Sequence, residues 1–278
     1  MKATSHHLAR RLLQRLVVRI PVAIVLFAIL CPTAAWSQES DKRQPLQELF
    51  LTETVYPQER GEFQITLGAL GDRTRTDTAA LVPVSIEFGL TDRWQLEAGW
   101  DGYTHFHSAP FKQMRTARFS AGTKYSMMNI AGSRVHAAFG LDAEFPRSGA
   151  FAEGEGEDNI ELEPFVALSA DIARHLNLFA SFAMSVEADD EAVRNLSERL
   201  DDNGSIGGGL LVPMEHVTIA VEYTSRSDQL PWRLDGSPLI TPSLIIRRGK
   251  WETAFGMPIG VRAGARTPGI ALHLIREF

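Results

Sequence analysis

The sequence predicts an all-β fold, a twelve-stranded antiparallel transmembrane β-barrel. Three observations lead to this prediction. Apolar and polar residues alternate along segments of roughly ten residues, as in strands with one apolar and one polar face. Short turns and longer loops alternate between these segments, and the chain begins with an export signal. Barrels that span outer membranes combine an even strand number with this alternation of turns and loops.

Residues 1–37 have the three parts of a secretory signal peptide. A basic region without acids comes first, an apolar core follows at residues 22–30, and Ala35 and Ser37 are the small residues near which we expect cleavage. The apolar run is about a dozen residues, shorter than the roughly 20 of a spanning helix, so a signal anchor is the less favoured alternative. The rest of the chain divides into a polar, irregular periplasmic N-terminal segment (38–60), which tucks under or into the barrel, and the barrel itself (61–278).

Charge and cysteine content narrow the range of functions. The chain has 28 basic and 34 acidic residues, and residues 1–37 contain basic residues but no acids, so the mature chain is distinctly acidic. This balance argues against nucleic acid as a partner. The single cysteine, Cys31, leaves with the signal, so disulfides do not stabilise the exported protein.

The first strands surround the clearest hairpin of the sequence. Residues 62–70 alternate, and a loop at 71–78 follows. Residues 81–90 (LVPVSIEFGL) and 94–103 (WQLEAGWDGY) also alternate, and the polar turn Thr91-Asp92-Arg93 joins them. A polar loop is expected at 104–115.

The remaining strands repeat this scheme. The segments 134–145 and 176–187 have the longest runs of alternation, with every second residue from Val135 to Phe145 and from Leu176 to Val186 on the apolar face. Short turns are expected near 129, 173, 213 and 247, and longer loops at 146–158, 188–203, 227–236 and 262–268. The other predicted strands are 116–127, 159–171, 204–212, 217–226, 238–246, 251–261 and 269–278.

Two other all-β folds share parts of this pattern. The short turns recur about every 40 residues, as in propellers, but a propeller blade needs four short strands per repeat. A soluble sandwich would have the same alternation with water on its polar face. Aromatic residues favour the membrane, because Trp94 and Trp251 follow short turns and Tyr103, Tyr125, Tyr223 and Phe145 stand near strand ends, where interfacial girdles lie.

The last strand resembles the C-terminal signal of bacterial outer-membrane barrels. Ile270, Leu272 and Leu274 occupy its apolar face and Phe278 ends it, whereas Arg276 stands where a hydrophobic residue is usual. An arginine near the interface can extend its charge to water at little cost. The resemblance implies that the barrel assembly machinery recognises this strand, and that lipid of the outer membrane surrounds the protein.

Three segments of the sequence, which we call phrases, resemble a narrower family: ETVYPQERGEFQITLGA, VSIEFGLTDRWQLEAGW and SLIIRRGKWETAFGMPIGV. They resemble the Gram-negative outer-membrane transporter family named after a phenol-degradation (meta-pathway) protein. The resemblance covers most of the mature chain but rests on these strand-turn-strand phrases, which contain no catalytic motif. The resemblance implies passage of small or hydrophobic compounds, aromatic ones among them.

If the apolar faces meet lipid, the opposite residues line the lumen. Either these charges line a water-filled passage that favours cations or binds a solute, or they pair across a narrow interior and hold it shut. Acids outnumber bases among them, so pairing cannot neutralise every acid. The lumen-lining candidates are Glu87, Glu97, Asp101, Arg118, Lys124, Arg134, Asp142, Glu144, Glu161, Glu163, Glu222 and Glu252.

The sequence favours transport or binding over catalysis. His105 and His107 could ligate a metal if a third ligand approached, and His107 with Ser108 raises the alternative of a lipid-active enzyme. Adjacent strand residues point to opposite faces, however, and no phosphate loop or redox pair is present, so we expect no enzyme, metal or cofactor. The main rival is a non-transporting barrel that stabilises the envelope or contacts other proteins.

Overall fold

The structure is a computed structural model that describes residues 46, 49–73, 77–108, 111–115, 119–145, 160–188, 204–226, 238–261 and 268–278. The side chains of residues 72–79, 101–108, 111–115, 186–188 and 226 lie outside this description, as does the predicted signal peptide. The chain divides into the compact units Met1–Lys42 and Arg43–Phe278, and only the second contains described residues. No helix among the described residues has the length and hydrophobicity needed to cross a membrane.

The second unit consists almost entirely of strands. Its elements are β1 (Phe63–Arg73), β2 (Asp77–Thr91), β3 (Trp94–Ser108), β4 (Phe111–Arg115), β5 (Phe119–Met127), the 3-10 helix η1 (Ile130–Gly132), β6 (Val135–Phe145), β7 (Ile160–Ala173), β8 (Leu176–Met184), β9 (Val186–Ala188), β10 (Gly204–Pro213), β11 (Val217–Arg226), β12 (Leu239–Arg248), β13 (Trp251–Gly256), β14 (Ile259–Gly260) and β15 (Ile270–Glu277).

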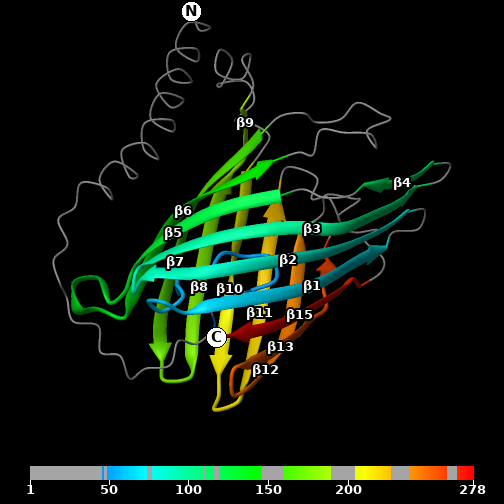
Figure 1. The fold of residues 1–278 in the computed structure, drawn as a ribbon. Helices are drawn as coiled ribbons and strands as arrows, with labels where there is room; N and C mark the ends of the chain where they lie inside the picture. Colours follow the sequence, from blue (N-terminus) through cyan, green and yellow to red (C-terminus); the bar gives the residue numbers. More distant parts are fainter. Residues whose placement is uncertain are drawn as a thin grey trace, which may run out of the picture. The chain divides into compact units, whose positions relative to one another are not determined.

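The strands form one closed antiparallel ring (Figure 1). Each strand pairs with its neighbour along the chain, and the ring closes where β1 pairs with β15, from Gln64 opposite Glu277 to Gly71 opposite Ile270. The short strands β4, β9 and β14 pair with β3, β7 and β12 respectively and continue the positions of β5, β8 and β13. The wall therefore has twelve strand positions, as predicted.

The predicted short turns are confirmed. Two residues separate β2 from β3, β7 from β8 and β12 from β13, while η1 lies in the longer turn between β5 and β6. In the first of these turns the Thr91 hydroxyl oxygen accepts the backbone N–H of Trp94 at 3.0 Å. Gly249 supplies the positive φ, 63°, that the β12–β13 turn requires.

Two predicted loops are wrong in extent, because the strands continue into them. β1 and β2 pair as far as Arg73 opposite Thr78, within the predicted loop 71–78. β3 extends to Ser108 and pairs with β4, so the two strands together occupy most of the predicted loop 104–115. Backbone pairing satisfies N–H and C=O groups whatever the side chains are, so a strand can continue where its apolar alternation has ended.

One predicted strand is interrupted. The segment 251–261 forms β13 and β14, with Met257 and Pro258 between them. Proline has no backbone N–H to donate to a neighbouring strand, which explains the break. The Met257 N–H still donates a hydrogen bond to β12, to the carbonyl oxygen of Pro242 at 3.1 Å.

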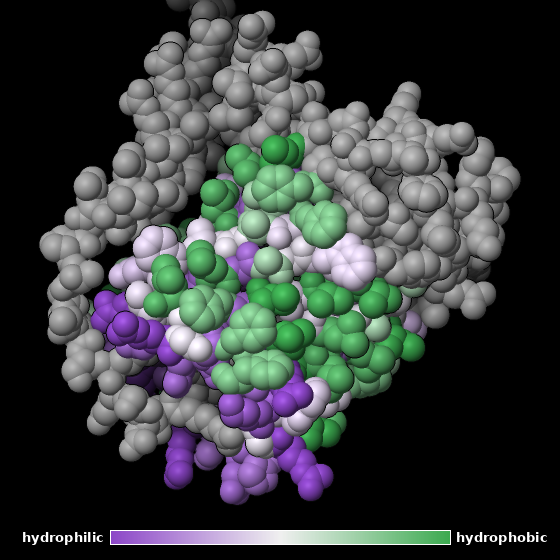
Figure 2. Space-filling view, in the orientation of Figure 1, coloured by the Kyte–Doolittle hydropathy of each residue, from purple (hydrophilic) through white to green (hydrophobic). Residues whose placement is uncertain are grey.

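The outward face of the ring is apolar. Exposed large hydrophobic side chains alternate with buried residues along β1, β2, β12, β13 and β15. Leu67, Leu244 and Phe255 are among the exposed side chains. Figure 2 shows hydrophobic residues (green) over the strands, with hydrophilic residues (purple) gathered toward the end where Figure 1 shows the β12–β13 turn. Such a surface needs an apolar solvent, so the ring spans a membrane.

Aromatic residues mark the turn end of this face. Trp94 and Trp251 begin β3 and β13 and are exposed. The Arg276 guanidinium carbon lies 5.0 Å from the ring centroid of Trp251 and 4.5 Å from that of Phe278. The unexpected arginine of the last strand is therefore accommodated by cation–π contacts between two rings.

Candidate functional site

The N-terminal segment that precedes β1 lies inside the ring. Leu46, Val55 and Gln58 are almost fully buried, and Figure 1 shows this blue segment within the ring of strands. Leu46, Leu49 and Phe50 form an apolar cluster with inward residues of β1, β2, β8, β10, β11, β12, β13 and β15. We call residues 49–58 the interior segment. Its burial answers the question, open from sequence, of whether this part tucks under or into the barrel.

A carboxylate of β11 holds one end of the interior segment. Glu222, which is 0% exposed, accepts hydrogen bonds from the backbone N–H groups of Phe50 at 3.3 Å and Leu51 at 3.0 Å, and from the Thr52 hydroxyl at 3.1 Å. Three donors around one carboxylate offset the cost of burying its charge. Glu222 therefore fixes the path of the backbone at the start of the segment.

A second carboxylate holds the other end, next to β1. Glu87 accepts hydrogen bonds from the side-chain amides of Gln58 at 2.9 Å, Gln95 at 2.6 Å and Gln64 at 3.2 Å. The Gln58 backbone N–H donates in turn to the Gln95 side-chain oxygen at 2.9 Å. Lys124, also buried, is near enough to attract the Glu87 carboxylate electrostatically.

A third anchor joins the segment to β7 and β8. The Asn177 side-chain amide donates to the Tyr56 hydroxyl oxygen at 2.9 Å, to Ser169 Oγ at 2.7 Å and to Asp171 Oδ1 at 2.9 Å. Asp171 also lies 3.2 Å from Nε2 of His136. The network is local to the short-turn end of β7 and β8, so it secures the part of the segment between the two carboxylate anchors.

Glycines of the wall leave room for the interior segment. A Cβ atom added at Gly256 would lie 2.7 Å from the Phe50 ring, and one added at Gly207 would lie 2.6 Å from Thr52 Cγ2. At Gly89 it would clash with the backbone carbonyl oxygen of Glu59. The wall and the interior segment are thus complementary in shape at both ends of the segment. This fit favours a segment that stays inside the barrel.

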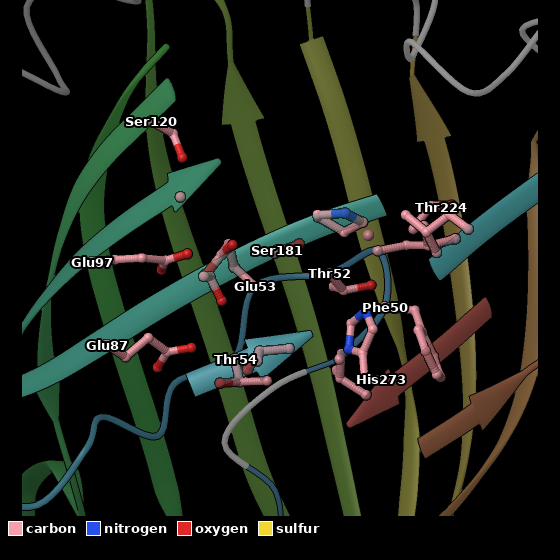
Figure 3. A pocket seen from close by; sticks show the side chains of 18 of the residues that line it. Phe50, Thr52, Glu53, Thr54, Glu87, Glu97, Ser120, Ser181, Thr224 and His273 are labelled. Atoms are coloured by element: carbon pink, nitrogen blue, oxygen red, sulfur yellow. The ribbon is translucent and has the colours of Figure 1, made fainter. Parts of the chain in front are cut away.

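A cavity of about 320 Å³ lies between the interior segment and the wall. Figure 3 shows its two unlike sides: Glu87 and Glu97 on one, and Phe50 and His273 on the other. The Phe50 and His273 rings are 4.4 Å apart, and buried leucines of β1 and β2 adjoin them. A cavity of this size and mixed lining is typical of a small-molecule site.

Several predicted lumen residues form a row across the wall. The register places Glu87 opposite Glu97, Glu97 opposite Gly122, Gly122 opposite Asp142, and Asp142 opposite Glu163. The row thus crosses β2, β3, β5, β6 and β7 at one level. The row therefore gathers the carboxyl groups of four strands at one level of the wall, beside the buried Lys124.

The other predicted lumen residues have different surroundings. Glu144 stands opposite Glu161 in the next row, and Glu161 accepts a hydrogen bond from the Ser185 hydroxyl. Glu252 is buried and pairs with Arg247, the two groups lying 2.7 Å apart. Arg134 is exposed next to β6. Arg118 and the side chain of Asp101 lie outside the description.

Sequence reasoning missed the contributions of the interior segment to the cavity. Phe50, Thr52 and Glu53 line it, and His273 of β15 faces them. A signal was present, since Leu46, Leu49 and Phe50 form an apolar group within an otherwise polar stretch. The catalytic and metal alternatives cannot be followed, because the side chains of His105, His107 and Ser108 lie outside the description.

Comparison with known proteins places the fold. No family model and no curated protein matches the chain. Among solved structures, it resembles the KdgM porin in complex with disordered oligogalacturonate, with 9% identity, a TM-score of 0.50, and coverage of 77% of this chain and 99% of the porin. It also resembles the outer membrane phospholipase A of Escherichia coli (9% identity, TM-score 0.40, coverage 84% and 94%) and the TodX monoaromatic hydrocarbon channel mutant (10%, 0.39, 79% and 90%).

These observations define the class of the protein. The last two TM-scores are below 0.5, so the likeness to the porin is the one that bears on the fold. A closed antiparallel ring of twelve strands with an apolar outer face is a transmembrane barrel of the bacterial outer-membrane type. Its candidate functional site is the interior cavity.

Proposed function

We propose that this outer-membrane barrel passes or binds small solutes, hydrophobic or aromatic ones among them, through its charged interior. The observation that carries the proposal is the cavity of about 320 Å³, with carboxylates on one side and Phe50, Leu70 and Leu81 on the other. An apolar solute fits the second side, and a polar or charged group of the same solute fits the first. The resemblance of the strand-turn-strand phrases to the meta-pathway transporter family supports aromatic solutes.

Conductance across a planar lipid bilayer tests this function. The mature chain, purified in detergent and added to one side, is expected to produce discrete conductance steps that heat-denatured protein does not. A band that shifts on boiling in gel electrophoresis would establish that the added protein was folded. Folded protein that never conducts and releases no small solute from vesicles would contradict the proposal.

A second function is favoured by one specific observation. The interior segment fills part of the lumen and is hydrogen-bonded to the wall at three places, through Glu222, Glu87 and Asn177. A barrel closed in this way is suited to a structural or interaction role in the envelope. The two functions differ in the bilayer experiment, because a structural barrel stays silent even after the interior segment is removed.

A further inference from the structure

Basic residues of two neighbouring wall strands and their turn surround an exposed tryptophan at the short-turn end of the outward face. Arg248 ends β12, Trp251 begins β13 and Arg276 lies near the end of β15, and all three are exposed. The register places Arg248 opposite Trp251, and Trp251 opposite Arg276. Lys250, also exposed, lies in the two-residue turn between β12 and β13. We call Arg248, Lys250 and Arg276 the basic trio.

The basic trio lies at the edge of the apolar outward face. The next outward residues toward mid-strand are Ile246 on β12 and Leu274 on β15, and both are exposed. Trp251 and Phe278 are exposed beside the trio. Figure 2 shows the change from hydrophobic to hydrophilic residues toward this end of the barrel. Aromatic rings and long basic side chains at such an edge lie at the level of the lipid headgroups.

The chain does not neutralise these three cations itself. Within the part of the chain that the structure describes, no carboxylate forms an ion pair with the basic trio. The inward neighbour Arg247 differs, because it pairs with Glu252 at 2.7 Å. Glu215, the exposed acid of the adjoining β10–β11 turn, lies 3.7 Å from its own neighbour His216. The outward cations are therefore available to an anion from outside the chain.

The surroundings of Arg276 position its charge without using its hydrogen-bond donors. Its guanidinium carbon lies 5.0 Å and 4.5 Å from the ring centroids of Trp251 and Phe278. Aromatic faces attract the positive charge, but they do not replace the oxygen acceptors that the five N–H groups of a guanidinium can bind. No described residue accepts a hydrogen bond from this side chain. The two rings hold the guanidinium at the edge of the apolar face, where an external oxygen can reach it.

The spacing of the basic trio suits one phosphate group. Neighbouring strands are about 4.8 Å apart, so the backbones at Arg248 and Arg276, two strands apart, are separated by about 10 Å. Long side chains from these two positions can converge on a phosphate that lies between them. Guanidinium groups bind phosphate oxygens through paired hydrogen bonds, and the Lys250 ammonium adds a compact charge. Acyl chains attached to the same phosphate would contact the exposed Ile246 and Leu274.

We infer that the basic trio and Trp251 bind the phosphate headgroup of an anionic phospholipid in the periplasmic leaflet around the barrel. Short turns of outer-membrane barrels face the periplasm, which assigns the leaflet. A lipid fits better than free phosphate, because the apolar face adjoins the trio and one lipid satisfies both. The inference gives the unexpected Arg276 of the last strand a binding role. It does not depend on the proposed function, since the trio lies outside the lumen.

Quenching of Trp251 fluorescence by brominated lipids tests the inference. The mature chain, with its other tryptophans replaced by phenylalanine, is folded into phosphatidylcholine vesicles that contain brominated phosphatidylglycerol or brominated phosphatidylcholine. Each basic residue near an anionic lipid surface provides about fivefold in affinity, so the anionic lipid should associate at Trp251 tenfold or more tightly than the neutral one. Equal association of the two lipids would overturn the inference. Displacement of the anionic lipid by added inorganic phosphate would also overturn it, in favour of a free-anion site.

Variants in the same Trp251 chain locate the site. Arg276→Leu and Arg248→Gln should each lower the preference for phosphatidylglycerol about fivefold, whereas association of phosphatidylcholine should not change. Arg174→Gln removes an exposed arginine from the β7–β8 turn at the same end of the barrel and is the matched control. An equal loss in Arg174→Gln would mean that the whole turn end attracts anions without a site.

Folding of each variant is established by its boiling-dependent gel shift. Arg248→Gln disturbs neither of the cation–π contacts of Arg276, so it tests the site even if Arg276→Leu does not fold. A folded Arg248→Gln variant that keeps the full preference for phosphatidylglycerol would show that the inference is wrong.

Discussion

The carboxylate of Glu222 accepts the backbone N–H of Leu51 at 3.0 Å, across 171 residues of sequence. This contact joins the interior segment to β11, and the Phe50 N–H and the Thr52 hydroxyl share the same carboxylate. The interior of the barrel is therefore organised around a buried acid whose hydrogen bonds go to the chain's own N-terminal segment.

Replacing Glu222 should release the interior segment. Glu222→Leu keeps most of the side-chain volume but leaves two backbone N–H groups and a hydroxyl without an acceptor, at a cost of about 1–3 kcal/mol for each buried donor. Hydrogen exchange at the Phe50 and Leu51 amides should become faster by a factor of ten or more, about the ratio that 1.4 kcal/mol represents. Glu252→Gln changes a buried acid that pairs with Arg247 and should leave these amides protected. Unchanged exchange in Glu222→Leu would show that the carboxylate is dispensable.

Gly89→Ala should displace the segment where it meets β1. The new methyl group would collide with the Glu59 carbonyl oxygen, which is backbone and cannot rotate away. We expect faster trypsin cleavage after the exposed Arg60, because the hydrogen bonds of Gln58 to Glu87 and Gln95 would be lost together. Gly71→Ala, where nothing lies within 4 Å of the new methyl group, is the control. Equal cleavage of both variants would argue against a close fit at Gly89.

Deleting residues 46–58 should enlarge the open lumen. The deletion removes the buried leucines, Phe50 and Tyr56 from the interior while every wall strand remains. Single-channel conductance of the deletion variant is expected to exceed that of the full mature chain several-fold. Its boiling-dependent gel shift must first show a folded barrel. A folded deletion variant with no conductance would favour the structural role over transport.

A charge introduced on the outward face should lower the free energy of unfolding more in the middle of a strand than in a turn. Leu244 lies in the middle of β12 and is exposed, and Met214 is equally exposed in the turn after β10. If lipid surrounds the wall, Leu244→Arg should lower the free energy of unfolding by about 2–4 kcal/mol and Met214→Arg by about 0–1 kcal/mol. Urea titration of the protein folded into phospholipid vesicles measures both. Equal, small effects would mean that water, not lipid, covers the strands.

Much of the wall was predictable because strand alternation is a local property. A period of two along each segment assigns residues such as Leu67 and Leu244 to the outer face and Gln64 and Ile245 to the inner one. The short turns were predictable for the same reason, because turn residues such as Thr91 and Gly249 act within a few positions of themselves. The strand ends beyond residues 70 and 103 were not, because backbone pairing there continues without an apolar pattern.

The sequence by itself determined the number of strands, their order and the alternation of apolar outward and inward residues along them. Tertiary structure alone decided the rest. The row of Glu87, Glu97 and Asp142 depends on the register between neighbouring strands, and the position of the interior segment depends on contacts such as Leu51 with Glu222. Hydrogen bonds between residues this distant in sequence leave no periodic trace, because no spacing along the chain specifies which donor will meet which acceptor once the barrel closes.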